Sequence, residues 1–321
     1  MRFTHLQAKL LLVVLHLLVP VGLLLWTWRG PDSGLVDWAA RVLLLLGYGL
    51  FIYLVGSWVF ASFYIRYALI LMTLTVVARS ILTFKEMPLW PQGGAAFWAG
   101  DGLMAVAFIV LAFLSANALR ARHFVSQALS LSFPFTHGVY GVFEGGDGRK
   151  SVLMNYHFGS SAHGHSGVNN SMKYAVDMTK LSHWGNDAKG FLSKQRERYP
   201  IFNATLLSPC EGRVKGVMDR WPNEEPWSGR GPYNLGNYVL IQTGNYYVLM
   251  GHLQQGSITV KEGQRVEAGE PIALAGNSGW TSQPHLHIQA MQISNDSFWN
   301  GEGVPIVFDG KNPYKNRLFF R

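Results

Sequence analysis

Cysteine is almost absent from this chain: Cys210 is the only one among 321 residues. A single cysteine cannot form an intrachain disulfide, and it excludes a zinc site built from several thiolates. A metal site in this chain must therefore use histidine and carboxylate ligands. Cys210 lies in the turn-like stretch Ser208-Pro209-Cys210-Glu211-Gly212, which indicates a structural role for the thiol.

Charged side chains are also scarce, at 14% of the residues, and no dense run of lysine and arginine occurs. The net charge of +8 would suit an anionic partner, but no nucleic-acid-binding motif accompanies it. We therefore expect no nucleic-acid partner. Basic residues beside membrane segments and a mildly basic domain account for most of the excess charge.

Long apolar runs fill the first third of the chain, and several are long enough to cross a lipid bilayer. The short connection Ile65-Arg66-Tyr67 allows three spans as well as four. The sequence predicts a membrane domain of three or four α-helices over residues 1–122, a linker at 123–129 and a second domain at 130–321. The candidate spans are about 10–28, 42–64, 67–84 and 95–119.

Two charged residues, Arg79 and Asp101, fall within these apolar segments. A charge inside a membrane can mark a transport pathway. Here Arg79 lies one turn from the end of its segment, where its side chain can reach the interface, and Asp101 is also near an interface. We interpret the membrane domain as an anchor.

Basic residues give only a weak prediction of orientation. With four spans, both termini lie on one side, and the basic residues there slightly outnumber those opposite, which favours a cytoplasmic second domain. Three spans would place that domain outside. In the four-span arrangement, the basic residues on the side of the two termini are Arg2, Lys9, Arg66, Arg120 and Arg122, and those on the opposite side are Arg29, Arg41 and Lys85.

From about residue 130, short alternating apolar runs are broken by glycine, asparagine, aspartate and proline. This pattern predicts an all-β domain with an antiparallel, sandwich-like or small barrel-like core. One short helix is expected near 189–198. The candidate strands are 151–157, 173–178, 212–218, 238–242, 246–249, 272–275 and 285–291.

Three features of this second domain suggest chemistry. His285 and His287 alternate along a predicted strand, so both face the same side. His252 follows the apolar strand at 246–250, and Asp177 interrupts an otherwise apolar one. A buried histidine or aspartate can simply be hydrogen-bonded in a core. Taken together, the four residues favour a metal or acid–base site.

The run from Ser208 to Met291 resembles the lysostaphin-type (LytM-domain) peptidoglycan metallopeptidases. The resemblance extends over roughly residues 130–321 and is strongest at 208–291. It implies a zinc cofactor and peptidoglycan as substrate. The matching motifs, in order, are Ser-Pro-Cys-Glu-Gly-Arg-Val, Gly-Asn-Tyr-Val-Leu-Ile, Gly-His-Leu, Val-Lys-Glu-Gly-Gln-Arg-Val-Glu-Ala-Gly, Gly-Asn-Ser-Gly and Pro-His-Leu-His-Ile.

The resemblance also implies roles for individual residues. Asp177 and His287 would be zinc ligands. His252 and His285 would activate the attacking water and stabilise the oxyanion. Because peptidoglycan lies outside the cytoplasmic membrane, the resemblance implies a multi-pass protein of the cytoplasmic (inner) membrane whose peptidase domain is extracytoplasmic or periplasmic, opposite to the side that the basic residues favour.

One position departs from the family pattern. Lys173 stands where the family usually has a histidine, four residues before the aspartate. If strands 151–157 and 173–178 form a hairpin, His157 comes opposite Lys173 and can replace the missing ligand. An Asn-x-His like Asn155-Tyr156-His157 precedes the Tyr-Ala-x-Asp strand in some members of the family. We expect His157 as the third ligand, with His165 as the second choice.

The departure at Lys173 leaves two functions open. In the first, the protein is a membrane-anchored zinc endopeptidase that cleaves peptidoglycan cross-links or stem peptides. In the second, the site is degenerate, and the domain binds peptidoglycan or regulates another wall hydrolase without cleaving. Retention of all four other site residues favours the enzyme.

Overall fold

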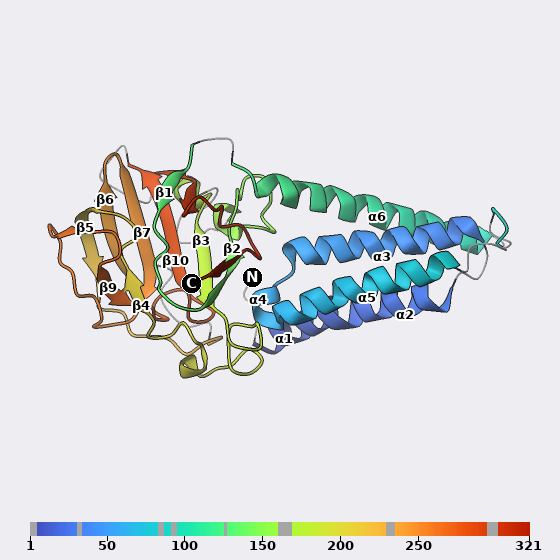
Figure 1. The fold of residues 1–321 in the computed structure, drawn as a ribbon, viewed down its shortest axis with the longest axis horizontal. Helices are drawn as coiled ribbons and strands as arrows, with labels where there is room; N and C mark the ends of the chain where they lie inside the picture. Colours follow the sequence, from blue (N-terminus) through green and yellow to red (C-terminus); the bar gives the residue numbers. More distant parts are fainter. Residues whose placement is uncertain are drawn as a thin grey trace.

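The computed structural model shows an elongated helical bundle joined at one end to a β-domain (Figure 1). It describes residues 5–30, 34–82, 87–90, 95–124, 127–159, 169–228, 235–293 and 301–321. A helical membrane segment followed by an antiparallel β-domain is the fold class that the sequence predicts, and the structure confirms it.

Four long apolar helices form the bundle, and each is long and apolar enough to cross a membrane: His5–Arg29, Leu35–Val55, Phe63–Leu82 and Trp98–Ala121. A π-helical turn, Val14–Leu18, interrupts the first of them. The helical elements are α1 (His5–Val13), α2 (Val19–Arg29), α3 (Leu35–Val55), α4 (Trp58–Ala61), α5 (Phe63–Leu82) and α6 (Ala95–Ala121).

The second predicted span, 42–64, is wrong at its end, because α3 stops at Val55. A Cβ on Gly56 would lie 2.4 Å from the Ile52 carbonyl oxygen, so only glycine fits this break. His16, from the π-helical turn, accepts a hydrogen bond from the Ser57 backbone N–H at 2.8 Å. A contact with a distant helix thus ends α3, although the apolar run continues.

Arg79 and Asp101 lie near the end of the bundle that is remote from the β-domain. Arg79 donates to the Trp28 carbonyl oxygen at 2.7 Å, and its guanidinium lies 3.9 Å from the centre of the Trp28 ring. Asp101 is buried beside the ion pair of Asp37 and Arg41. Arg79 therefore interacts with an interfacial tryptophan, as its position near the segment's end predicts.

The β-domain is built on one antiparallel sheet of nine strands in the order β13-β2-β3-β10-β7-β6-β5-β8, with β11 also paired to β10. Two small sheets, β1 with β12 and β4 with β9, complete it. The strands are β1 (Leu129–Leu131), β2 (Val139–Glu144), β3 (Val176–Lys180), β4 (Thr205–Leu207), β5 (Gly212–Met218), β6 (Asn237–Thr243), β7 (Tyr246–Leu253), β8 (Arg265–Val266), β9 (Pro271–Leu274), β10 (Leu286–Gln292), β11 (Glu302–Val304), β12 (Ile306–Phe308) and β13 (Leu318–Phe320).

The strand predicted at 151–157 is absent, and so is its hairpin with 173–178. Turns occupy this segment up to a 3-10 helix, Tyr156–Gly159, and β3 pairs with β2 and β10 instead. The Asn155 side-chain amide donates to the carbonyl oxygens of Gly146 and Ala175. These local bonds compete with strand pairing. The helix expected near 189–198 is also wrong: only a 3-10 turn, Arg196–Arg198, forms there.

Alternation along β3 and β10 separates the core from the site. Val176 and Ile288 belong to the main hydrophobic core, whereas Asp177 and His287 point to the opposite face. Near the site, that face also carries a smaller apolar cluster that includes Leu249 and Met291. The main hydrophobic core therefore packs against the face of the sheet opposite to the one that carries the site.

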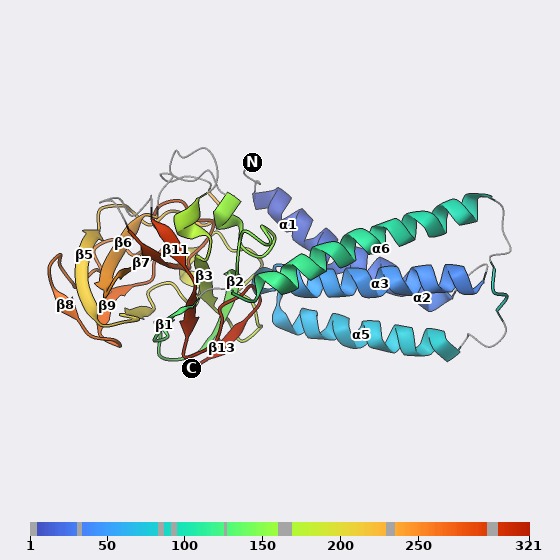
Figure 2. The ribbon, with the colours of Figure 1, turned by 90° about the horizontal axis from the view of Figure 1, so that it is seen from above.

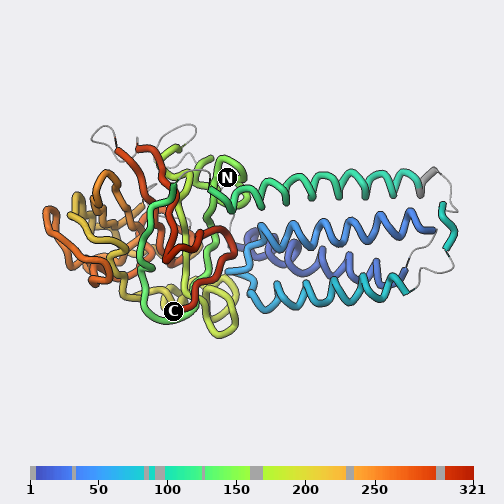
Figure 3. Tube along the Cα trace, turned by 45° about the horizontal axis from the view of Figure 1, so that its top comes forward, coloured from blue at the N-terminus to red at the C-terminus, as the bar shows by residue number. Residues whose placement is uncertain are grey.

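The bundle and the β-domain share a packed junction. Trp58, Val59 and Phe63 pack against Phe143 of β2. The Asn316 side-chain amide donates to the carbonyl oxygens of Leu54 and Gly56. Figure 2 and Figure 3 show that α1 begins, and α6 ends, beside the β-domain. Residue 5 and the β-domain thus lie at the same end of the bundle.

Asp187 is a buried acid at this junction. Its backbone N–H donates to the Val59 carbonyl oxygen at 2.8 Å, and neither carboxylate oxygen has a hydrogen-bond partner among the described residues. Burial raises the pKa of this carboxyl from 3.8 to about 8. The unfolded chain releases the proton near pH 4, but the folded chain keeps it to about pH 8. The free energy of unfolding therefore falls as the pH rises between these values.

An Asp187→Asn variant should be more stable than the wild type, by on the order of 3 kcal/mol at pH 8. Thermal unfolding of the full chain in detergent, followed from pH 5 to pH 8, should show a difference in melting temperature between the variant and the wild type that widens as the pH rises. Asp147 is the matched control, because it is equally buried but bonded to Arg149, so its Asn variant should lose stability. An equal difference in melting temperature at pH 5 and at pH 8 would contradict this account.

Candidate metal centre

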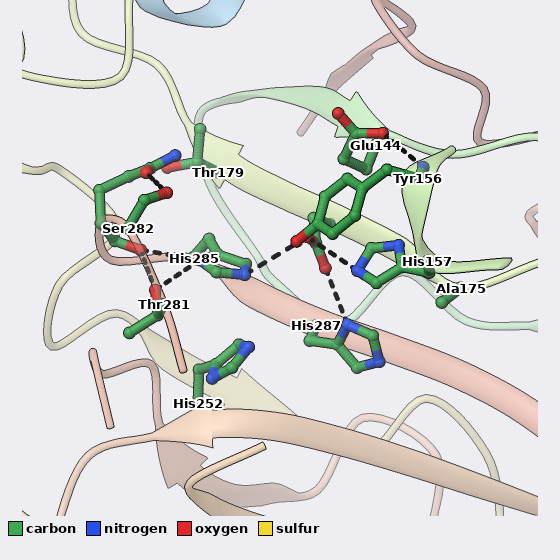
Figure 4. Close-up of polar contacts among 12 residues, drawn as sticks. Glu144, Tyr156, His157, Ala175, Thr179, His252, Thr281, Ser282, His285 and His287 are labelled. Atoms are coloured by element: carbon green, nitrogen blue, oxygen red, sulfur yellow. Dashed lines mark hydrogen bonds and ion pairs between the residues drawn. The ribbon is translucent and has the colours of Figure 1, made fainter. Parts of the chain in front are cut away.

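Asp177 and His287 are direct partners in the antiparallel pairing of β3 with β10. His287 also lies opposite Gly251 of β7, next to His252. His285 immediately precedes β10, and Figure 4 shows it converging with His157 and His287 on one point. Three neighbouring strands thus bring residues far apart in the sequence to one place.

The carboxylate of Asp177 is at the centre of this cluster. Its oxygens lie 2.8 Å from His287 Nδ1, 3.2 Å from His157 Nε2 and 3.5 Å from His285 Nε2. The possible ligand atoms of His157, Asp177 and His287 all lie within 4.8 Å of one another. Two imidazoles and one carboxylate at this spacing suit a metal ion with an open fourth position.

The two histidines of this trio are each oriented by an amide oxygen. His157 Nδ1 lies 2.8 Å from Asn155 Oδ1, and His287 Nε2 lies 2.9 Å from Gln289 Oε1. Each ring thus places one nitrogen against an amide oxygen and the other against the Asp177 carboxylate. Such a second hydrogen bond is the usual way that a protein fixes the orientation of a metal-binding imidazole.

His252 and His285 form a second pair, with ring centres 4.5 Å apart. His285 Nδ1 lies 2.7 Å from the Gln283 carbonyl oxygen, and His252 Nδ1 lies 2.9 Å from that of Ser278. These carbonyls accept from Nδ1–H, so both Nε2 atoms are free to accept a proton. His252 has a φ of 62°, a strained conformation of about 1–3 kcal/mol that often marks functional sites.

The whole cluster is shielded from solvent, since the five residues are only 1–6% exposed. Burial lowers the pKa of His252, and the neighbouring His285 and His287 lower it further. Burial also lowers the pKa of His285, against the effect of Asp177. For Asp177, burial acts to raise the pKa, but His157 and His285 hold it well below its usual range. Burial lowers the pKa of His157 too, but the Asp177 carboxylate outweighs it, so the pKa of His157 is raised. The site thus sets the lowered pKa values of His252 and His285 beside an ionised carboxylate.

Lys173 lies away from the cluster. It is buried and pairs with the Glu302 carboxylate, and Glu302 lies opposite Gln292 in the β10–β11 pairing. Gln292 is five residues beyond His287, about 17 Å along the strand. Lys173 therefore supports the edge of the sheet. His165, the second choice for the third ligand, lies outside the described residues.

His157 reaches the cluster by a route that the sequence did not predict. It sits on the 3-10 helix, and the Tyr156 backbone N–H donates to Glu144 Oε2 at 3.1 Å. Glu144 is in turn bonded to Lys315 at 2.9 Å. Glu144 and Gln289 were missed as supporting residues. The alternation of 285, 287 and 289 on one face would have indicated Gln289, but no local pattern indicates Glu144.

Residues 202–302 match the family model described as Peptidase family M23. The β-domain of this chain belongs to peptidase family M23. The segment matched by the M23 model contains His252, His285 and His287, whereas His157 and Asp177 precede it. This agrees with the lysostaphin-type resemblance seen in the sequence.

Two curated relatives of this M23 domain come from Vibrio cholerae. Peptidoglycan DD-endopeptidase ShyA is 48% identical over 120 residues, which cover 30% of this chain and 27% of ShyA. Peptidoglycan DD-endopeptidase ShyB is 42% identical over 123 residues, which cover 31% of this chain and 28% of ShyB. The chain thus spans less than a third of the length of either relative.

Among solved structures, a zinc-containing peptidase from Vibrio cholerae is similar to this chain. Its sequence identity is 21% and its TM-score is 0.32, over 55% of this chain and 39% of that one.

Proposed function

We propose that this protein is a membrane-anchored zinc metalloendopeptidase that hydrolyses peptide bonds in peptidoglycan, in cross-links or stem peptides. The observation that carries the proposal is the buried trio of His157, Asp177 and His287 beside a second pair of histidines. Similarity to two peptidoglycan DD-endopeptidases supports the substrate class and favours the D,D-peptide bonds of cross-links.

The donor set fits zinc. His157 Nε2, His287 Nδ1 and a carboxylate oxygen of Asp177 would hold the ion, and Asn155 and Gln289 keep the two imidazoles in the required orientation. When bound, zinc supplies a Lewis acid that lowers the pKa of water and polarises a carbonyl group. The same three residues leave one position for water or substrate.

His252 and His285 would transfer the protons. Their Nδ1–H groups are held by backbone carbonyls, so each can accept a proton at Nε2 from the attacking water and return it to the leaving amine. Their lowered pKa values keep both rings neutral before the reaction. Once protonated, either ring can donate a hydrogen bond to the oxyanion.

We further propose a multi-pass location in the cytoplasmic membrane with the M23 domain on the wall side. The substrate class and the four apolar helices support this. Because residue 5 and the M23 domain lie at the same end of the bundle, the chain would begin on the wall side too. Reporter fusions after residue 321 should be active only when the reporter works outside the cytoplasm. Activity of a cytoplasmic reporter alone would reverse this orientation.

Digestion of purified sacculi tests the enzymatic proposal. The full chain in detergent should release soluble peptidoglycan fragments, a chelator should stop the release, and added zinc should restore it. An Asp177→Ala variant serves as the matched control. If the folded, zinc-loaded chain releases nothing, the proposal is wrong.

The alternative is a degenerate domain that binds peptidoglycan or regulates another wall hydrolase. Lys173 at the usual ligand position favours it, while the trio completed by His157 argues against it. Metal content separates the two functions. A folded chain that neither contains nor takes up zinc would support the regulatory function.

A further inference from the structure

Three arginines gather where the bundle meets the M23 domain. Arg66 lies in the first turn of α5, Arg122 directly follows α6, and Arg317 directly precedes β13. In Figure 1, α5 begins and α6 ends at the side of the bundle that faces the β-domain. This position is at the level of lipid headgroups if the four helices span a membrane.

Arg66 is buried, with 4% of its surface exposed. Its two Nη atoms donate to the carbonyl oxygens of Asn316, at 3.3 Å, and Tyr53, at 2.9 Å. The guanidinium lies 3.8 Å from the centre of the Tyr53 ring. Its Nε atom is buried and has no hydrogen-bond partner among the described residues. One donor of a fixed cation is therefore unused.

Arg122 also has hydrogen-bond donors without partners among the described residues. Its guanidinium lies 4.6 Å from the centre of the Tyr314 ring, and its Nε and Nη2 atoms are buried without partners in the described part of the chain. Arg317 donates to the hydroxyl of the same tyrosine at 3.1 Å. Arg122 is close enough to repel both Arg66 and Arg317 electrostatically.

No carboxylate among the described residues forms an ion pair with any of these three arginines, although most buried cations in proteins are paired. Elsewhere at the junction the rule holds, since Lys315 is paired with Glu144. Three like charges, of which Arg66 and Arg122 have donors without partners in the described part of the chain, make a site for an anion. A phosphate suits guanidinium groups, which bind it through paired hydrogen bonds.

An apolar groove begins at Arg66, one member of this arginine cluster. Its volume is about 360 Å³, it lies between α2, α3 and α5, and Arg66 and Tyr53 are at one end of it. Along α5 it is lined by Leu69, Ile70, Thr73 and Leu74, so it extends about 12 Å from Arg66 into the bundle. A cationic end followed by an apolar channel matches a phosphate group with an acyl chain attached.

We propose that Arg66, Arg122 and Arg317 bind the phosphate of an anionic glycerophospholipid, with one of its acyl chains in the groove between α2, α3 and α5. Arg66 and Arg122 belong to the bundle, and Arg317 belongs to the M23 domain. The bound lipid therefore bridges the two parts and holds the peptidase domain against the membrane. The inference rests on the proposed insertion of the helices in a bilayer, and it is independent of catalysis.

Native mass spectrometry of the full chain in detergent tests this site with three probes: phosphatidylglycerol, zwitterionic phosphatidylcholine and inorganic phosphate. The wild type should retain phosphatidylglycerol in preference to phosphatidylcholine. Arg122→Gln should weaken phosphatidylglycerol binding about ten-fold, because it removes charge-assisted hydrogen bonds. Arg120→Gln is the matched control, since Arg120 has the same charge and is exposed two residues earlier, in the last turn of α6. It should bind as the wild type does.

Arg66→Gln also removes two bonds that hold the junction, so it can fail to fold. Arg317→Gln is the second variant, and it should show the same loss as Arg122→Gln. Equal retention of both lipids by the wild type would overturn the proposal, as would unchanged selectivity in both folded variants. If inorganic phosphate binds as tightly as phosphatidylglycerol, the site takes a free anion and the lipid assignment is wrong. None of these results requires zinc or peptidoglycan, so they are separate from a failure of the proposed enzymatic function.

Discussion

A His157→Ala variant is expected to lose its zinc, whereas a Lys173→Gln variant is expected to keep it. His157 Nε2 lies 3.2 Å from the Asp177 carboxylate, while Lys173 is paired with Glu302 at the edge of the sheet. Loss of a supporting residue around a metal typically reduces affinity ten- to a hundred-fold, and loss of a ligand should exceed that, at about a thousand-fold. Metal content and competition with a chelator measure the effect.

Asp177→Ala and His287→Ala should behave as His157→Ala does, because each supplies one atom of the same trio. Circular dichroism of every variant checks that the M23 domain is folded. The Lys173→Gln variant is the matched control, since it also changes a buried residue of this region. If it loses zinc while His157→Ala retains it, then the sequence position of Lys173, and not the geometry of His157, determines the site.

His285→Ala and His252→Ala should have the opposite effect: they keep zinc and lose turnover. Neither residue belongs to the trio, and each has its Nδ1–H bonded to a backbone carbonyl. Positioned acid–base groups contribute about a hundred- to ten-thousand-fold to rates. We expect a loss in that range for each variant, measured as release of fragments from sacculi at saturating zinc.

His183→Ala is the matched control for this pair, because His183 is exposed and takes no part in the cluster. It should retain both zinc and activity. Loss of zinc from either His252→Ala or His285→Ala would mean that this residue is a ligand. Full activity of both variants would mean that the proton is transferred by another group.

Much of the site follows from periodicity in the sequence. Alternation along a strand places His285 and His287 on one face, and their distances of 3.5 and 2.8 Å to Asp177 agree with it. An isolated aspartate in an apolar strand must find partners, and Asp177 finds three histidines. The strands β5, β6 and β10 were predicted within one residue of their observed bounds because regular hydrogen bonding repeats a local pattern, whereas β7 was predicted to end at 249 and extends to Leu253.

Periodicity in the sequence does not predict how His157, the third member of the trio, reaches the site. His157 was expected through a hairpin that does not exist, yet its ring is within reach of Asp177. Side-chain hydrogen bonds of Asn155 fold this segment into turns, and Glu144 holds the following residue. These bonds join residues without any periodic spacing. The same reason explains α3, whose end depends on His16, 41 residues away from its partner Ser57.

The most direct test is an anomalous difference map at the zinc edge from crystals of the full chain grown with zinc. Our account predicts one strong peak within bonding distance of His157 Nε2, His287 Nδ1 and an Asp177 carboxylate oxygen, with His252 and His285 beside it but unbound. A peak that lacks His157, or the absence of any peak at Asp177 in zinc-loaded crystals, would contradict it.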